Sequence, residues 1–174
     1  PSDGAERPTL TGLLLISTAK PSGEFDHAAL LPGNEIYTPG TEIQFTATGV
    51  DSGGYNVALP EDVTFALSED SAGMGAIDAA TGLFSAAADA EGIVTVQALR
   101  GGAVVGSTSI ELAKPDSIYF NTAEISLGFN DSTDFGVEVK NKGRDVNYKA
   151  GDLVWTLSDE RLGTFDGNIF TSSE

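Results

Sequence analysis

The sequence contains no cysteine, so structural disulfides, thiolate zinc sites and cysteine nucleophiles are excluded. Long hydrophobic runs are also missing. The longest ones have four residues, Leu13 to Ile16 and Ala28 to Leu31, whereas a membrane-spanning helix needs about 20. We therefore expect no membrane insertion. No charged-then-apolar leader opens the chain, and we expect it to be a piece of a longer protein.

Positive charge is scarce as well. Nine Lys and Arg stand against 26 Asp and Glu, which gives a net charge of −17. A surface this acidic repels phosphate backbones and anionic lipid headgroups, so nucleic acid is not an expected partner. The plainest interpretation is a solvated acidic surface that keeps the protein soluble, although loops rich in carboxylates can also collect Ca²⁺.

Residues for catalysis are few and scattered. His27 is the single histidine, and with no cysteine or second histidine it cannot found a zinc site. No Gly-x-Ser-x-Gly motif accompanies it. The adjacent acids Glu61-Asp62, Glu69-Asp70 and Asp159-Glu160 lie in polar turns, whereas a glycosidase needs two carboxylates about 5–10 Å apart in a cleft. We predict that the chain has no catalytic residues of its own.

What the sequence does contain is strand pattern. Apolar and polar residues alternate over Thr41–Thr48, Val63–Leu67 and Val94–Ala98, and a period of two places one side of a strand on a core. Arg100-Gly101-Gly102-Ala103 predicts a hairpin turn, because glycine tolerates the positive φ that such turns need. The short alanine-rich stretch 86–90 is expected to be a loop. The core residues predicted from the alternation are Ile43, Phe45, Phe65, Leu67, Val94 and Val96.

An internal repeat organises these strands. Four blocks recur in the same order: Thr41–Phe45 as Thr133–Val137, Phe65–Asp70 as Trp155–Glu160, Gly75–Asp78 as Gly163–Asp166, and Gly82–Ser85 as Asn168–Thr171. The repeat predicts an all-β fold with tandem Ig-like antiparallel β-sandwiches over residues 20–113 and 114–174. Lys114-Pro115-Asp116 is the expected junction. The second sandwich is expected to be truncated by about two strands, since nothing follows it that matches Gly92–Leu112.

The repeated pattern resembles the bacterial Ig-like group 2 family. The matching features are an apolar-aromatic-x-Leu-Ser strand, a Gly-x-aliphatic/aromatic-Asp block and a Gly/Asn-x-Phe-Ser/Thr hairpin, followed in the first copy by Gly92-Ile93-Val94-Thr95-Val96-Gln97-Ala98. The resemblance covers about residues 35 to 174. It implies an Ig-like fold and leaves function open, because such modules serve as spacers, adhesins and enzyme accessories.

Residues 1–19 differ from the rest. Pro1-Ser2-Asp3-Gly4-Ala5-Glu6-Arg7-Pro8, followed by the apolar run from Leu13, resembles the closing segment of bacterial phosphodiester glycosidase domains, which are similar to the uncovering enzyme. The resemblance implies the terminal strand of an upstream domain, with Ser2, Asp3 and Arg7 in a loop near that domain's site. Alternatively, Asp3-Gly4 is simply a turn and Arg7 an anchoring ion pair. The glycine-rich catalytic motif of that family is not in this chain.

The sequence contains two candidate binding sites, one for Ca²⁺ and one for sugars. Asn130-Asp131-Ser132-Thr133-Asp134 has the oxygen density for Ca²⁺, with Asp131 and Asp134 as weak ligand candidates, but it lacks the spacing of a calcium loop. It is otherwise a turn before a strand, and no metal or other cofactor is required. Tyr119, Phe120, Phe129 and Trp155 suit a sugar-stacking platform, although Trp155 matches Phe65 and is expected to be a core residue.

Together these patterns predict a non-catalytic accessory or spacer region of a bacterial cell-surface or secreted protein that resembles a phosphodiester glycosidase. Its expected partners are the upstream catalytic domain, further surface modules of the same protein and cell-wall glycan. The alternative is an adhesin or S-layer module that binds glycan or protein.

Overall fold

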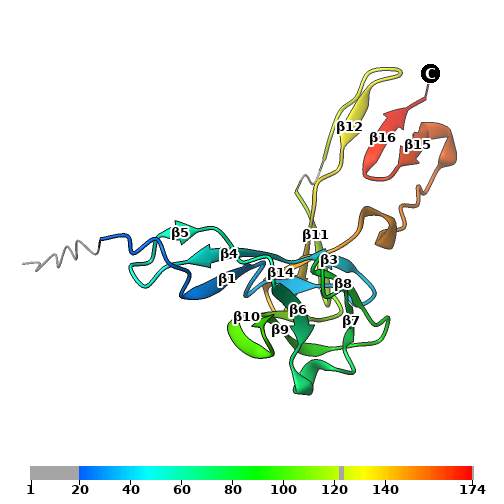
Figure 1. Cartoon of the computed structure of the whole chain (residues 1–174). Coiled ribbons are helices and arrows are strands. Elements are labelled where there is room, and N and C mark those ends of the chain that lie inside the picture. The colour runs from blue at the N-terminus through cyan, green and yellow to red at the C-terminus, as the bar shows by residue number, and fades with distance from the viewer. Residues whose placement is uncertain (1–19, 122–123, 174) are drawn as a thin grey trace, which may run out of the picture.

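The computed structural model describes residues 20–121 and 124–173 (Figure 1). Strands dominate these residues, which contain three short 3₁₀ helices and no α-helix. The first half contains β1 (His27–Leu31), β2 (Ile36–Tyr37), β3 (Glu42–Gln44), β4 (Thr46–Val50), β5 (Asn56–Val57), β6 (Val63–Leu67), η1 (Glu69–Ser71), β7 (Gly75–Ile77), β8 (Leu83–Ala86), β9 (Gly92–Arg100) and β10 (Ala103–Leu112). The second half contains β11 (Ser117–Phe120), β12 (Ser132–Asp134), β13 (Val137–Asn141), β14 (Arg144–Asn147), η2 (Ala150–Asp152), η3 (Glu160–Leu162), β15 (Gly163–Asp166) and β16 (Ile169–Ser172).

The strands from β1 to β10 form a sandwich, which we call the first unit. One layer consists of two small sheets, in the orders β1-β4-β5 and β3-β8-β7, and the other contains β2, β10, β9 and β6. The core between the layers includes Ile43, Phe45, Phe65, Val94 and Val96, all at most 9% exposed. Leu67 is partly buried and packs against them. The alternation therefore predicted the core faces correctly, and the all-β sandwich fold is confirmed.

The expected continuous strand over Thr41–Thr48 is wrong in one respect, because it divides at Phe45. Residues before Phe45 pair with β8, whereas residues after it pair with β1. Phe45 is fully buried, and its backbone N–H donates to the carbonyl of Gly82 (2.9 Å). The chain thus turns a corner of the sandwich at Phe45, which a simple alternation of side chains does not reveal.

The hairpin between β9 and β10 is present where the two glycines predict it. Arg100 pairs with Ala103, and Gly101 and Gly102 have φ values of 57° and 83°. Farther along β10 a bulge precedes Gly106, where an added Cβ would lie 2.9 Å from the carbonyl carbon of Ala28. Glycine at this position therefore allows β1 to pack closely on β10. The loop expected over residues 86–90 is also observed, apart from Ala86 at the end of β8.

The strands from β11 to β16, which we call the second unit, repeat the topology of the first. The order β11-β13-β14 repeats β1-β4-β5, and β12-β16-β15 repeats β3-β8-β7. Figure 1 shows the latter sheet standing apart from β14 and from the strands of the first unit. In both units a glycine before the hairpin, Gly75 or Gly163, lies under a phenylalanine ring, where an added Cβ would come within 2.7 or 2.6 Å of ring carbons.

One block of the sequence repeat is out of register by two residues. Thr41–Phe45 corresponds to residues 131–135, not to Thr133–Val137, because Ile43 pairs with Phe84 exactly as Thr133 pairs with Phe170. Phe45 therefore corresponds to Phe135. Each packs edge-on against the phenylalanine of its hairpin, with centroids 6.3 Å apart for Phe45 and Phe84 and 6.1 Å apart for Phe135 and Phe170. Aromatic packing, and not the threonine match, sets the register.

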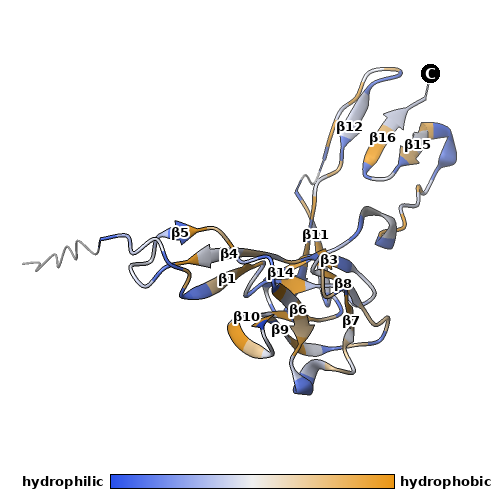
Figure 2. Ribbon diagram, in the orientation of Figure 1, coloured by the Kyte–Doolittle hydropathy of each residue, from blue (hydrophilic) through white to orange (hydrophobic). Residues whose placement is uncertain are grey.

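The second unit differs from the first in its other layer. Residues 153–157, which correspond to β6, form no strand, and no equivalents of β9 and β10 occur among the described residues. Trp155 is consequently half-buried. It stacks on Phe165 at 4.8 Å and contacts Phe120 and Phe135 at 5.9 Å. Figure 2 shows hydrophobic stretches on β16 and β15 that lie well apart from those of β6 and β10.

A buried carboxylate fixes the start of the first unit. Asp51, 0% exposed, accepts hydrogen bonds from four backbone N–H groups: Tyr55 and Gly53 on one oxygen (2.9 and 2.8 Å), Ser22 and Gly23 on the other (2.7 and 3.2 Å). These donors, that of Tyr55 above all, hold the pKa of Asp51 at about 2 despite its desolvation. The segment leading into β1 is thereby tied to the turn between β4 and β5. The terminal strand expected within residues 1–19 lies outside the described residues.

Low pH should weaken the hydrogen bonds that the Asp51 carboxylate accepts. Because the pKa of Asp51 is depressed in the folded state, its stabilising contribution is complete above its usual value of 3.8 and is lost as the pH falls towards 2. Asp51→Asn should lower stability at neutral pH, since its amide N–H groups would face backbone donors, and should flatten the pH dependence between 4 and 2. Urea unfolding across this range measures both effects. Asp89→Asn, at an exposed position of the same unit, should instead behave as the wild type.

Candidate functional site

The two units meet through a shared β-sheet. Its seven strands run in the order β11-β13-β14-β2-β10-β9-β6, so β2 lies between β10 of the first unit and β14 of the second. Both pairings are parallel. Ile36 faces Glu111 on one side and Val146 on the other, and Tyr37 likewise faces Leu112 and Asn147. A strand of two residues thus carries backbone hydrogen bonds across the junction.

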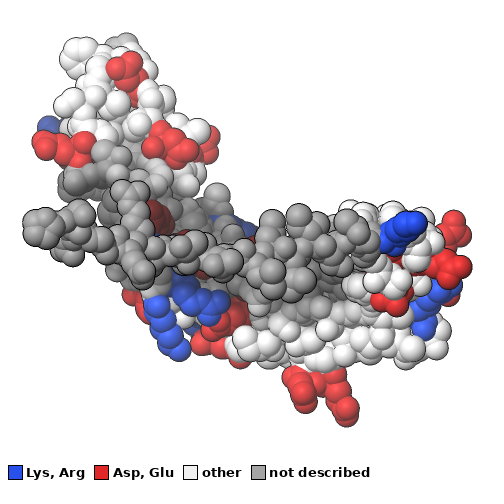
Figure 3. Space-filling model, turned by 90° about the vertical axis from the view of Figure 1, so that its left-hand side faces the viewer, with Lys and Arg blue, Asp and Glu red and all other residues white. Residues whose placement is uncertain are grey.

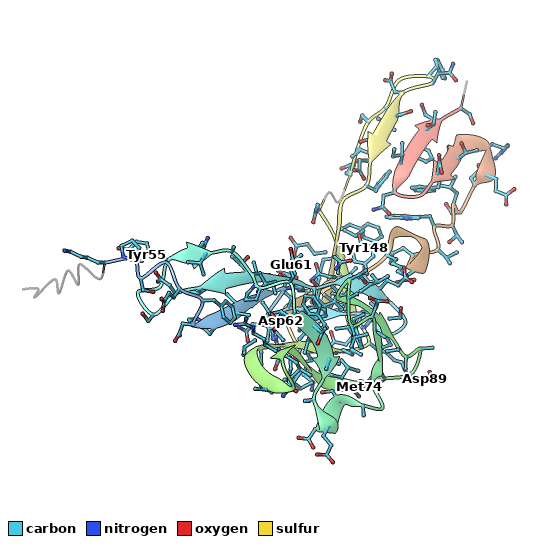
Figure 4. All side chains as sticks on the ribbon, viewed as in Figure 1. Tyr55, Glu61, Asp62, Met74, Asp89 and Tyr148 are labelled. Atoms are coloured by element: carbon cyan, nitrogen blue, oxygen red, sulfur yellow. The ribbon has the colours of Figure 1, made fainter. Side chains whose placement is uncertain are left out.

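Strands of this sheet contribute to a small apolar cluster, which we call the junction cluster. It consists of Ile36 and Ala113 from the first unit and Val139 and Val146 from the second, all at most 7% exposed, with Val137 and Tyr148 packed against them. In Figure 4, Tyr148 lies between the two units, whereas Tyr55 marks the far end of the first. Burial of these side chains from both units favours one fixed arrangement.

Polar contacts surround the junction cluster. Arg144 forms an ion pair with Glu111, and the side-chain amide of Asn147 donates to the carboxylate of Glu35 (3.0 Å) and the carbonyl of Ile36 (3.2 Å). The backbone N–H of Thr38 donates to the carbonyl of Asn147 (3.0 Å). The exposed pairs are individually weak, but together with the hydrogen bonds of Thr38 and Ile36 they fix the register of β14 on β2.

The short linker is held as well. The side-chain amide of Asn141 donates to the carbonyl of Lys114 (2.7 Å), and the carboxylate of Asp116 accepts from the backbone N–H of Lys142 (2.8 Å) and the hydroxyl of Ser117 (2.8 Å). These two bonds lower the pKa of Asp116. Beside them, hydrogen bonds to Asp145 and Glu138 (2.9 Å each) raise the pKa of the Lys140 ammonium. The linker therefore follows the turn between β13 and β14 instead of swinging freely.

The residues singled out for calcium lie apart from this junction. Asp131 accepts a hydrogen bond from the backbone N–H of Gly128 (2.8 Å) and thus closes a turn, while Asp134 is an exposed residue of β12. Residues 20–121 and 124–173 contain no group of three or more His, Asp or Glu side chains placed to hold a metal ion. Figure 3 shows carboxylates spread over the visible face instead of gathered in one patch. Ser2, Asp3 and Arg7 lie outside the described residues.

The histidine and the acidic residues considered for catalysis form ordinary ion pairs and hydrogen bonds. His27 is exposed beside Asp26 (2.9 Å), Asp62 accepts from Arg100 (2.9 Å), and Asp159 accepts from Arg161 and begins η3. The aromatic candidates differ in their exposure to solvent. Trp155 lies in the aromatic cluster of the second unit, whereas Tyr119, Phe120 and Phe129 are 54%, 61% and 81% exposed. Tyr119, Asn121, Glu138 and Lys140 line an open groove on β11 and β13.

These features define an all-β chain in which a β-sandwich is followed by a second unit that repeats part of it, the two being joined through one sheet. No protein-family model matches the chain, and no curated protein matches it. Human protocadherin-24 EC1-2 is a solved structure with partial likeness, at 12% sequence identity, a TM-score of 0.37, and coverage of 87% of this chain and 79% of that one. A TM-score of this size does not establish a common fold. In the part of the chain that the structure describes, no helix is both long and apolar enough to cross a bilayer.

Proposed function

We propose that this chain is a non-catalytic spacer of a bacterial cell-surface or secreted protein, which holds a neighbouring domain at a fixed distance and orientation. The seven-stranded sheet across the junction supports this proposal most strongly. Rotation of one unit against the other would break the pairing of β14 with β2 and expose the junction cluster. A flexible linker, by contrast, samples many separations of the domains it connects.

The sequence resemblances suggest what the spacer serves. The group 2 Ig-like pattern is typical of modules on bacterial surfaces, and the resemblance of residues 1–19 to the end of a phosphodiester glycosidase domain suggests an upstream enzyme. The tie between Asp51 and the segment at Ser22 and Gly23 would carry the rigidity of the first unit towards such a domain. Partners on this proposal are domains of the same protein and the cell wall.

A second candidate function is glycan binding. The observation that favours it is the groove beside the exposed ring of Tyr119, where the side chains of Asn121, Glu138 and Lys140 supply hydrogen-bonding groups. Aromatic faces stack on sugar rings, and polar groups at the rim select hydroxyls. Chemical-shift changes confined to β11 and β13 on addition of cell-wall fragments would favour an adhesin over a spacer.

The spacer proposal predicts the effect of placing a charge in the junction cluster. Val146 is 5% exposed, and an unpaired carboxylate there costs several kcal/mol unless the interface opens. Val146→Asp should therefore separate the units, raising the radius of gyration in small-angle X-ray scattering while the first unit remains folded. Val104→Asp, at a 54% exposed position of β10, is the control and should leave the scattering unchanged. Identical scattering from all three proteins would contradict a junction held by this cluster.

A further inference from the structure

The second unit has an apolar face that no layer covers among the described residues. Ile118 and Phe120 on β11 are 50% and 61% exposed, and Val154 is 88% exposed. Together with Val137, Leu153 and Trp155 they line a groove of mainly apolar character. Residues 153–157 form no strand, so their backbone groups have no ladder partner among the described residues.

In the first unit, the hairpin of β9 and β10 covers the equivalent face. Ala28 and Leu30, which correspond to Ile118 and Phe120, are 4% and 7% exposed because β10 packs over β1. The strand that corresponds to residues 153–157 is β6, and it pairs antiparallel with β9, with Phe65 opposite Ala98. One hairpin, β9 and β10, therefore both completes the sheet and covers the core.

The groove is also continuous with the interface between the units. Val137 packs against the junction cluster and lines the groove. Ile118 and Leu153 line both the groove and the adjoining cavity, which reaches Val139 and Tyr148. A segment seated in the groove would thus extend the buried surface that already joins the two units.

We propose that this face of the second unit is an acceptor site for a β-hairpin with the apolar pattern of β9 and β10. One strand of the hairpin pairs antiparallel with residues 153–157, and the other runs beside residues 126–127, which correspond to β2. The pattern that the site selects is the one on the inward positions of the first unit's hairpin: Val94, Val96, Ala98, Ile110 and Leu112. This inference concerns recognition and is independent of the spacer function.

Trp155 is a built-in reporter of occupancy. It is the single tryptophan of the chain and lines the groove, so its emission reports on the second unit alone. Covering the groove should shift the emission to shorter wavelength and reduce quenching by acrylamide. A hairpin paired with residues 153–157 should also slow their amide hydrogen exchange by about tenfold or more, because exchange then requires opening of the ladder.

The test appends a copy of residues 89–113 after Glu174, since Glu174 corresponds to Ala88. Tethering gives the appended hairpin a high effective concentration at the groove. The matched control appends the same segment with its copies of Val94, Val96 and Ala98 replaced by aspartate. We expect the emission shift and the slower exchange only with the unaltered segment, and expect Leu157→Asp to abolish both. Exchange of β6 verifies that the first unit is intact in every variant. The same emission and exchange with either segment, or without one, would overturn the proposal.

Discussion

Phe65→Ala is expected to lower the free energy of unfolding of the first unit by about 3–5 kcal/mol, the usual cost of removing a large ring from a packed core. Phe65 is 9% exposed and lies in the cluster with Phe84 and Val96. Its ring also covers Gly82, where an added Cβ would lie 3.0 Å from a ring carbon. Chemical denaturation measures the change. An unfolding midpoint equal to that of the wild type would contradict the burial of Phe65 in this core.

Trp155→Ala is the matched comparison, because Trp155 holds the position of Phe65 in the repeat. Its ring is half-buried, and no strand within the described part of the chain lies over it. The substitution should therefore cost less than Phe65→Ala, although tryptophan is the larger side chain. The reverse order would show that the second unit has the better-packed core.

Amide hydrogen exchange rates should differ between the two units even more strongly than the stability changes do. Protection over residues 63–67 is expected to exceed protection over residues 153–157 by on the order of 100-fold. Opening of β6 requires disruption of its ladder with β9, whereas the equivalent segment has no ladder partner in residues 20–121 and 124–173. Mass spectrometry of peptides from the monomeric chain resolves both segments. Equal protection would show that the second unit closes its core by a route that the repeat does not reveal.

Much of the first unit was predictable because its strands are amphipathic. A period of two over β6 and β9 indicates which side chains face the core, and Gly101-Gly102 indicates where the hairpin turns. The corner at Phe45 was not predictable in this way, because the alternation continues through it while the chain changes sheets. The match of Thr41 with Thr133 also gave a wrong register for the second unit, because the packing of Phe135 on Phe170 sets that register.

The junction was beyond sequence reasoning for a physical reason. β2 has two residues, and its partners lie more than 70 positions away on one side and 100 on the other, as the pairs Ile36 with Glu111 and Ile36 with Val146 show. Such a strand has no detectable period, and parallel pairing between distant segments leaves no local signal. The sequence indicated only a short linker at Pro115, which is compatible with rigid or loose units alike.

Because the chain contains no cysteine, two introduced cysteines would be the only sites for spin labels, and the distance between the two units can be measured directly. Ala80→Cys places a label at an exposed position of the first unit, and Lys142→Cys places one in the exposed turn between β13 and β14 of the shared sheet. Double electron–electron resonance then reports the distribution of distances between them. A shared sheet predicts one narrow distribution in the wild-type background, and a broad one once Val146→Asp is added. A broad distribution in the wild-type background would mean that the units move independently and that the chain is not a rigid spacer.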